Sequence, residues 1–163
     1  MPAIELILPC LALHFGDLTG WASGIPGHPP ASGAVNWRLS RTGSFSVPSM
    51  AGWLGSLQRS HPFFDRVAVV EAEIEGTVPL LMTIERWCRD VNAELVFVSP
   101  ATIKRIASGP FATRRDVLQW AASNFMQGPK SPHQIRCYEH AAALAAYQNV
   151  MEKILAEHKK NAR

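Results

Sequence analysis

The chain contains 163 residues, of which 47% are hydrophobic and 18% are charged. These values exclude an intrinsically disordered protein, and the length suffices for a sizeable core without disulfide or metal staples. The formal net charge is only +3, so composition alone is weak evidence for a polyanionic partner.

The first third of the chain has the pattern of a three-stranded antiparallel meander. Residues 10–15 form a short apolar run, and a tight turn at residues 16–18 leads into a second strand at residues 19–22. Glycines and prolines within residues 23–32 indicate an irregular loop. Residues 34–39 alternate apolar and polar side chains, which predicts the third strand.

The rest of the chain alternates strands with helices. Residues 67–70 are β-branched or small and apolar, which is typical of a central strand buried on both faces, and Glu71 follows directly. Thr113 and Asp116 have the spacing of a capping box at the start of a helix. The other expected elements are a strand at residues 94–98 and helices at residues 49–58, 78–91, 102–107 and 134–157.

This order of elements predicts an α/β protein with a mixed five-stranded sheet. We expect a three-strand antiparallel meander plus two parallel strands, flanked by helices on both faces. No linker or repeat divides the chain, so we expect one domain over residues 1–163, with its core at about residues 10–158. Ligands of such sheets bind at the carboxyl ends of the strands, where we expect His14 and Glu71 to lie near one another.

The cysteines and the apolar N-terminal segment bear on the compartment. The three cysteines are far apart and form no CxxC pair, which disfavours a zinc site or a disulfide framework. Cys10 and Cys88 lie in apolar runs and are expected to pack as small hydrophobic side chains in a reducing compartment. Residues 4–13 are apolar but are interrupted by Glu5 and Pro9, and they are too few to span a bilayer. We therefore expect a cytoplasmic protein with no membrane partner.

Three segments, taken in chain order, resemble a known family. Residues 11–22, LALHFGDLTGWA, resemble that family's first hairpin, in which an aspartate at the fourth position precedes a Thr-Gly-Trp-Ala turn. Residues 96–105, VFVSPATIKR, resemble its fifth strand and the helix start that follows, and residues 138–145, YEHAAALA, resemble its acidic C-terminal helix start. The family is that of the phage and prophage RuvC-like Holliday-junction resolvases, and the resemblance implies a ribonuclease-H-like fold.

The resemblance also implies a chemistry, which is two-metal phosphodiester hydrolysis. In the family, carboxylates from the first strand, the fourth strand and the last helix hold two hard cations, Mg or Mn. The corresponding positions here are His14, Glu71 and Ala141, with Glu139 beside the last. Because Glu71 is the one clean match, we expect a degenerate active site whose cleavage activity is lost or reduced, in which case no metal is needed.

Each residue of this expected site also has a second interpretation. His14 is either a buried core histidine or an altered metal ligand, and Glu71 is either a ligand or a partner in a structural salt bridge. Imidazole suits manganese or zinc better than magnesium. An active enzyme would therefore use His14, Glu71 and Glu139 as catalytic residues, with His140 as a further metal ligand. His140 points about 100° away from Glu139 around the helix, so we expect it to be partly exposed.

A cluster of basic residues flanks the expected site. Lys104, Arg105, Arg114 and Arg115 lie within one short stretch and would contact DNA phosphates without reading bases. The alternative is an ordinary solvated helix face.

Three functions therefore remain open. The first is a RuvC-like protein that binds branched or structured DNA, with cleavage lost or reduced. The second is an active, metal-dependent, structure-selective endonuclease with a remodelled His/Glu site. The third is a non-enzymatic protein-interaction module on the same fold. The resemblance implies a homodimer, since a four-way junction requires symmetric paired cuts.

Overall fold

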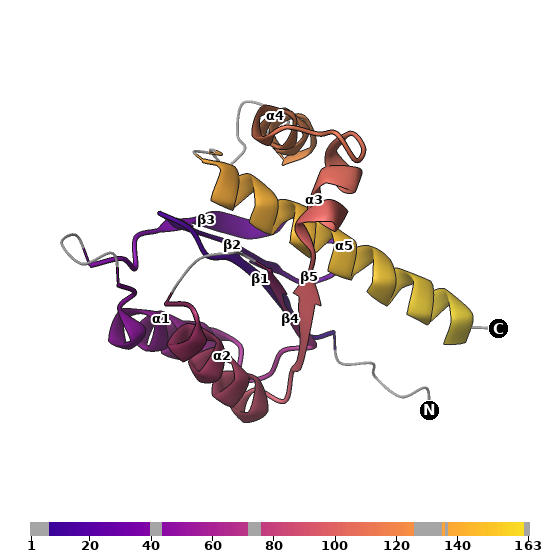
Figure 1. The fold of residues 1–163 in the computed structure, drawn as a ribbon. Coiled ribbons are helices and arrows are strands. Elements are labelled where there is room, and N and C mark those ends of the chain that lie inside the picture. The colour runs from indigo at the N-terminus through magenta and orange to yellow at the C-terminus, as the bar shows by residue number, and fades with distance from the viewer. Residues whose placement is uncertain (1–6, 40–43, 72–75, 126–134, 136, 162–163) are drawn as a thin grey trace.

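The computed structural model describes residues 7–39, 44–71, 76–125, 135 and 137–161, which form a five-stranded sheet with helices on both faces (Figure 1). The strand order is β3-β2-β1-β4-β5. Strands β1, β2 and β3 pair antiparallel, whereas β4 pairs parallel with both β1 and β5. The strands are β1 (Cys10–His14), β2 (Thr19–Gly24), β3 (Ala31–Val35), β4 (Arg66–Val70) and β5 (Glu94–Val98). The predicted fold class, a ribonuclease-H-like mixed sheet, is confirmed.

Five helices cover the two faces of the sheet unequally. Helices α1 and α2 lie on one face, and the long α5 crosses the other face with α3 and α4 packed beside it (Figure 1). No described helix combines the length and apolar composition that crossing a membrane would require. The helices are α1 (Val47–Ser60), α2 (Val78–Asp90), α3 (Pro100–Ala107), α4 (Arg114–Phe125) and α5 (Tyr138–Asn161).

The pleat of the central strands divides the core into two clusters. Side chains of a strand alternate between its faces. Cys10 and Ala12 of β1 therefore pack toward α5, whereas Leu11 and Leu13 pack toward α1 and α2. Cys10 and Cys88 are buried, as their apolar surroundings predict, and burial raises the pKa of each thiol to about 11.

The third strand is placed differently from the prediction. It runs from Ala31 to Val35 rather than over residues 34–39, because β2 continues to Gly24 and Ala31 pairs with Ser23. The glycines, prolines and other small residues just before β3 and within it are typical of a loop, so the sequence predicted no strand at its start. Gly33 lies opposite Trp21, whose Nε1 would be 3.0 Å from a Cβ at that position, so a glycine makes room for the indole.

The helix boundaries largely follow their sequence signals. The capping box is present, since the Asp116 backbone N–H donates to Thr113 Oγ1 (3.2 Å) and the Thr113 N–H donates to Asp116 Oδ2 (2.8 Å). Helix α1 extends the predicted 49–58 at both ends, and Ser46 caps its N-terminus. Helix α5 starts at Tyr138, later than the predicted 134, because Ile135 is not helical.

Candidate functional site

The first turn of α5 rests directly on the carboxyl edge of the sheet. A Cβ atom at Gly20 of β2 would overlap the Glu139 carbonyl and the His140 backbone nitrogen, and one at Gly16 would lie 2.6 Å from Glu139 Cγ. Glycine at position 20 therefore permits a backbone-to-backbone approach that any side chain would block, and Gly16 leaves room for the Glu139 side chain. This approach brings Glu139 over the β1–β2 turn, next to His14 at the end of β1.

His14 is enclosed rather than presented to solvent. It is 8% exposed, and its ring meets the ring of Tyr138 edge-on with a centroid separation of 5.5 Å. Its buried Nδ1 has no hydrogen-bond partner within the described residues. Burial lowers the pKa of His14 below its ordinary value, and the nearby negative charge of Glu139 opposes that shift only in part. The imidazole is therefore neutral at pH 7.

Tyr138 connects this buried histidine to an exposed cation. The guanidinium carbon of Arg114 lies 4.6 Å from the centroid of the Tyr138 ring, a cation–π contact. Burial raises the pKa of the Tyr138 phenol, and the positive charge of Arg114 counteracts this. Tyr138 is not among the site residues predicted from the sequence, because a cation–π pair between residues so far apart in the chain has no characteristic spacing.

Glu71 shares the edge with His14 but occupies the other face. Leu13 pairs with Val69, so Glu71 lies two residues further along and has the same orientation as Val69, toward α2. It is exposed, and within the described part of the chain it has no ion-pair partner. It borders a cavity of about 160 Å³ whose other lining residues are Phe15, Val69, Val70, Thr77, Leu81 and Phe97.

His140 differs from the expectation of partial exposure. It is 1% exposed, and its Nε2 lies 2.8 Å from Ser32 Oγ on β3. His140 is buried because Gly20 allows the first turn of α5 to pack closely against β2, which places the imidazole against the antiparallel strands. His14 and His140 thus contact different parts of the sheet.

The residues present do not fit a pair of hard divalent cations. Such ions require several converging carboxylate oxygens. Among the residues described, no three His, Cys, Asp or Glu side chains converge to hold a metal ion. Ala141, at the expected aspartate position, is completely buried in the packed core beneath α5, and His14 offers a single neutral nitrogen.

The four predicted DNA-contacting cations are all exposed. Lys104 and Arg105 lie in the last turn of α3, and Arg114 and Arg115 form the first turn of α4. None of the four has an ion-pair partner in the described ranges. Their charged groups therefore face solvent, with Arg115 close enough to Asp116 to help lower the pKa of that carboxyl and Arg114 stacked on Tyr138.

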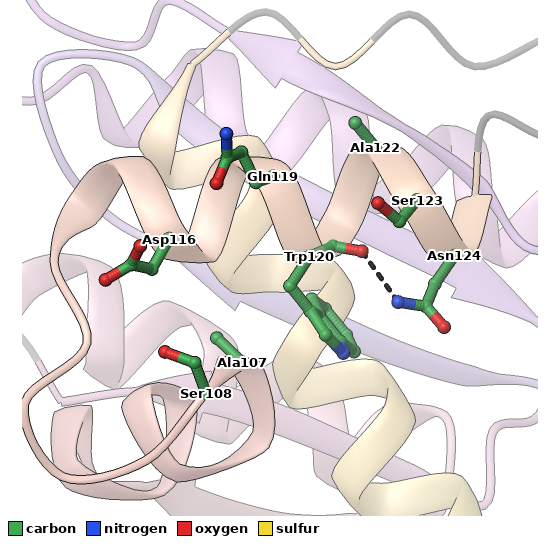
Figure 2. A pocket seen from close by; sticks show the side chains of 8 residues that line it. All are labelled: Ala107, Ser108, Asp116, Gln119, Trp120, Ala122, Ser123 and Asn124. Atoms are coloured by element: carbon green, nitrogen blue, oxygen red, sulfur yellow. Dashed lines mark hydrogen bonds between the residues drawn. The ribbon is translucent and has the colours of Figure 1, made fainter.

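A neighbouring hollow beside α4 lacks this charge. It has a volume of about 510 Å³, and Figure 2 shows Asn124 Nδ2 donating to the Trp120 carbonyl at 2.7 Å along its wall. Asp116 is its one ionisable lining residue and is engaged by Thr113, whose backbone hydrogen bond lowers the pKa of Asp116. This hollow has no positively charged lining residue to attract a phosphate.

Comparison with known proteins identifies the fold. No family model and no curated protein matches the sequence. A structure of Thermus thermophilus RuvC matches with a TM-score of 0.69 and 13% identity, covering 91% of this chain and 97% of that one. The chain has the RuvC fold. T. thermophilus RuvC in complex with a Holliday-junction substrate matches with a TM-score of 0.68, 13% identity and coverages of 91% and 96%. The fowlpox virus Holliday-junction resolvase matches with a TM-score of 0.56, 11% identity and coverages of 90% and 99%.

Proposed function

We propose that this protein binds branched or structured DNA through its phosphate backbone, and that metal-dependent phosphodiester cleavage is lost or much reduced. The RuvC fold supports the first part, because one structure with this fold is a complex with a Holliday-junction substrate. Lys104, Arg105, Arg114 and Arg115 would supply the phosphate contacts. The phage-type assignment, a cytoplasmic location and a homodimer matched to the symmetry of a junction belong to the same proposal.

One observation carries the proposal: an exposed arginine is stacked at the edge of a site where no carboxylates converge among the described residues. Arg114 lies over Tyr138, and Tyr138 lies against the neutral His14. A phosphate approaching this edge meets a positioned cation, which favours binding. Within the described ranges it does not meet the converging oxygen ligands that two hard cations need, which disfavours hydrolysis.

An active nuclease built on His14, Glu71, Glu139 and His140 is the second candidate. It is favoured by the unpartnered Nδ1 of His14, which lies within the electrostatic influence of Glu139. The positions of Glu71 and His140 count against this candidate. Glu71 lies on the face of the sheet that α2 covers, and His140 is hydrogen-bonded to Ser32. We therefore rank it below the binding protein.

The proposed binding is tested by titrating a labelled four-way junction and a matched linear duplex at low salt. We expect preference for the junction, and at least a tenfold weaker affinity for Arg114→Gln/Arg115→Gln, with the salt dependence reduced by about two phosphate contacts. Arg59→Gln is the matched control, because Arg59 is exposed at the end of α1 on the opposite face of the sheet. Failure of the unmodified protein to bind any DNA at low salt would overturn the proposal in favour of a protein-interaction module.

A further inference from the structure

A basic groove between α3 and α5 shares Arg105 with the four predicted DNA-contacting cations and adds Lys153. It has a volume of about 360 Å³ and is lined by Thr102, Arg105, Ile106, Asn149 and Lys153. The two cations come from different helices, and Arg105 Nη2 donates to Thr102 Oγ1 at 3.4 Å. The groove thus combines two positive charges with a hydroxyl and an amide.

Neither cation of this groove forms an ion pair within the described part of the chain, although Glu152 is next to Lys153 in α5. Arg105 and Lys153 are both exposed. The carboxylates nearby on α5 have other partners. Glu152 accepts a hydrogen bond from Gln148 at 3.2 Å, and Glu157 pairs with Arg66 at the opposite edge of the sheet.

The groove and the carboxyl edge are separated along α5 by a distance that a duplex covers in several base pairs. Helix α5 carries both Glu139, at the edge, and Lys153, in the groove. The helix rises 1.5 Å per residue, so these two positions lie about 21 Å apart along its axis. Base pairs stack 3.4 Å apart, so this distance corresponds to about six base pairs.

We propose that the α3–α5 groove binds the sugar–phosphate backbone of a duplex DNA arm, about six base pairs from the contact at the carboxyl edge. This inference rests on the proposed DNA-binding function and extends it from the edge to the length of α5. The guanidinium of Arg105 and the ammonium of Lys153 donate to phosphate oxygens. The Thr102 hydroxyl and the Asn149 amide add neutral donors, so the groove positions the arm without reading its sequence.

The decisive variant is Lys153→Gln, which removes one groove cation and leaves the carboxyl-edge cations intact. Binding of a four-way junction is measured between roughly 50 and 200 mM salt for the unmodified protein, Lys153→Gln, Arg114→Gln/Arg115→Gln and the Arg59→Gln control. We expect Lys153→Gln to reduce the slope of log affinity against log salt by about 0.9 and to weaken binding roughly threefold or more at the low-salt end. Hydroxyl-radical footprinting should show loss of protection about six base pairs from the region that the carboxyl-edge cations protect.

The outcomes separate this inference from the function on which it rests. If Lys153→Gln has the salt slope and footprint of the unmodified protein while Arg114→Gln/Arg115→Gln binds weakly, the groove is overturned and the proposed function stands. If the unmodified protein binds no junction at any salt concentration, both are overturned. A slope change in the Arg59→Gln control equal to that in Lys153→Gln would also overturn the groove, because the effect would then be one of net charge.

Discussion

The ionisation of His14 links its burial to the stability of the whole fold. Burial lowers the pKa of this imidazole in the folded protein, whereas in the unfolded chain it returns to about 6.5. The unfolded state therefore binds more protons as the pH falls below that value, and stability is lost in acid. His14 should contribute no pH dependence above about pH 7.5, where both states are neutral.

We predict that His14→Gln flattens this acid dependence. The free energy of unfolding, measured by urea denaturation between pH 7 and pH 5, should fall more steeply for the unmodified protein than for the variant. One proton gives a slope difference of at most about 1.4 kcal/mol per pH unit. Parallel curves for the two proteins would show that His14 does not titrate differently in the folded and unfolded states.

For single residues, the sequence predicted where the site residues lie along the chain but not the face of the sheet toward which their side chains point. His14 and Glu71 were expected together at the carboxyl edge, and their strands do end there side by side. The strand pleat then separates their side chains, and no spacing rule reveals on which face a residue just beyond a strand will project. His140 was misjudged for a related reason, since its burial depends on how closely α5 approaches β2. The catalytic and metal roles of His14, Glu71, Glu139 and His140 stay predictions.

At the scale of elements, docking of α5 on the sheet is the contact that builds the candidate site. We predict that Gly20→Ala lowers the free energy of unfolding by about 1–3 kcal/mol, because the new methyl group overlaps the Glu139 carbonyl and α5 must shift. Thermal or urea denaturation measures this change. The shift should also weaken junction binding, because it displaces Tyr138 and the arginine stacked on it.

Gly52→Ala is the matched control for this prediction. Gly52 lies within α1, and a Cβ there meets no atom within 4 Å. Alanine in an exposed helix should raise stability by up to about 1 kcal/mol. Equal effects of the two substitutions would contradict the close approach of α5 to Gly20.

Local sequence signals placed most elements, and the exceptions have physical causes. The β-branched run of β4 and the capping box of α4 are encoded within a few residues, so both were predicted correctly. Strand β3 was misplaced because its residues are small and its position is set by pairing with β2. Register between strands is a property of the pair, and one strand's pattern does not contain it.

At the scale of the molecule, the order of strands and helices was sufficient for the fold class. An antiparallel meander followed by strand–helix alternation leaves few ways to build one sheet, and the observed order places β1 at its centre, between β2 and β4. The order of elements does not predict the function in the same way, because one fold can support many activities. The basic groove between α3 and α5 illustrates the gap, because Arg105 and Lys153 are distant in sequence and meet only when the helices pack.

The proposed function is that of a protein with the RuvC fold that binds junction DNA without cutting it. The most direct test incubates the purified protein with a labelled four-way junction in EDTA, in Mg²⁺ and in Mn²⁺, and follows complexes on native gels and strand lengths on denaturing gels. We predict a junction complex in all three conditions and intact strands in each. Metal-dependent nicking that disappears in Glu71→Gln or Glu139→Gln would contradict the account and would show that the site has been rebuilt around His14.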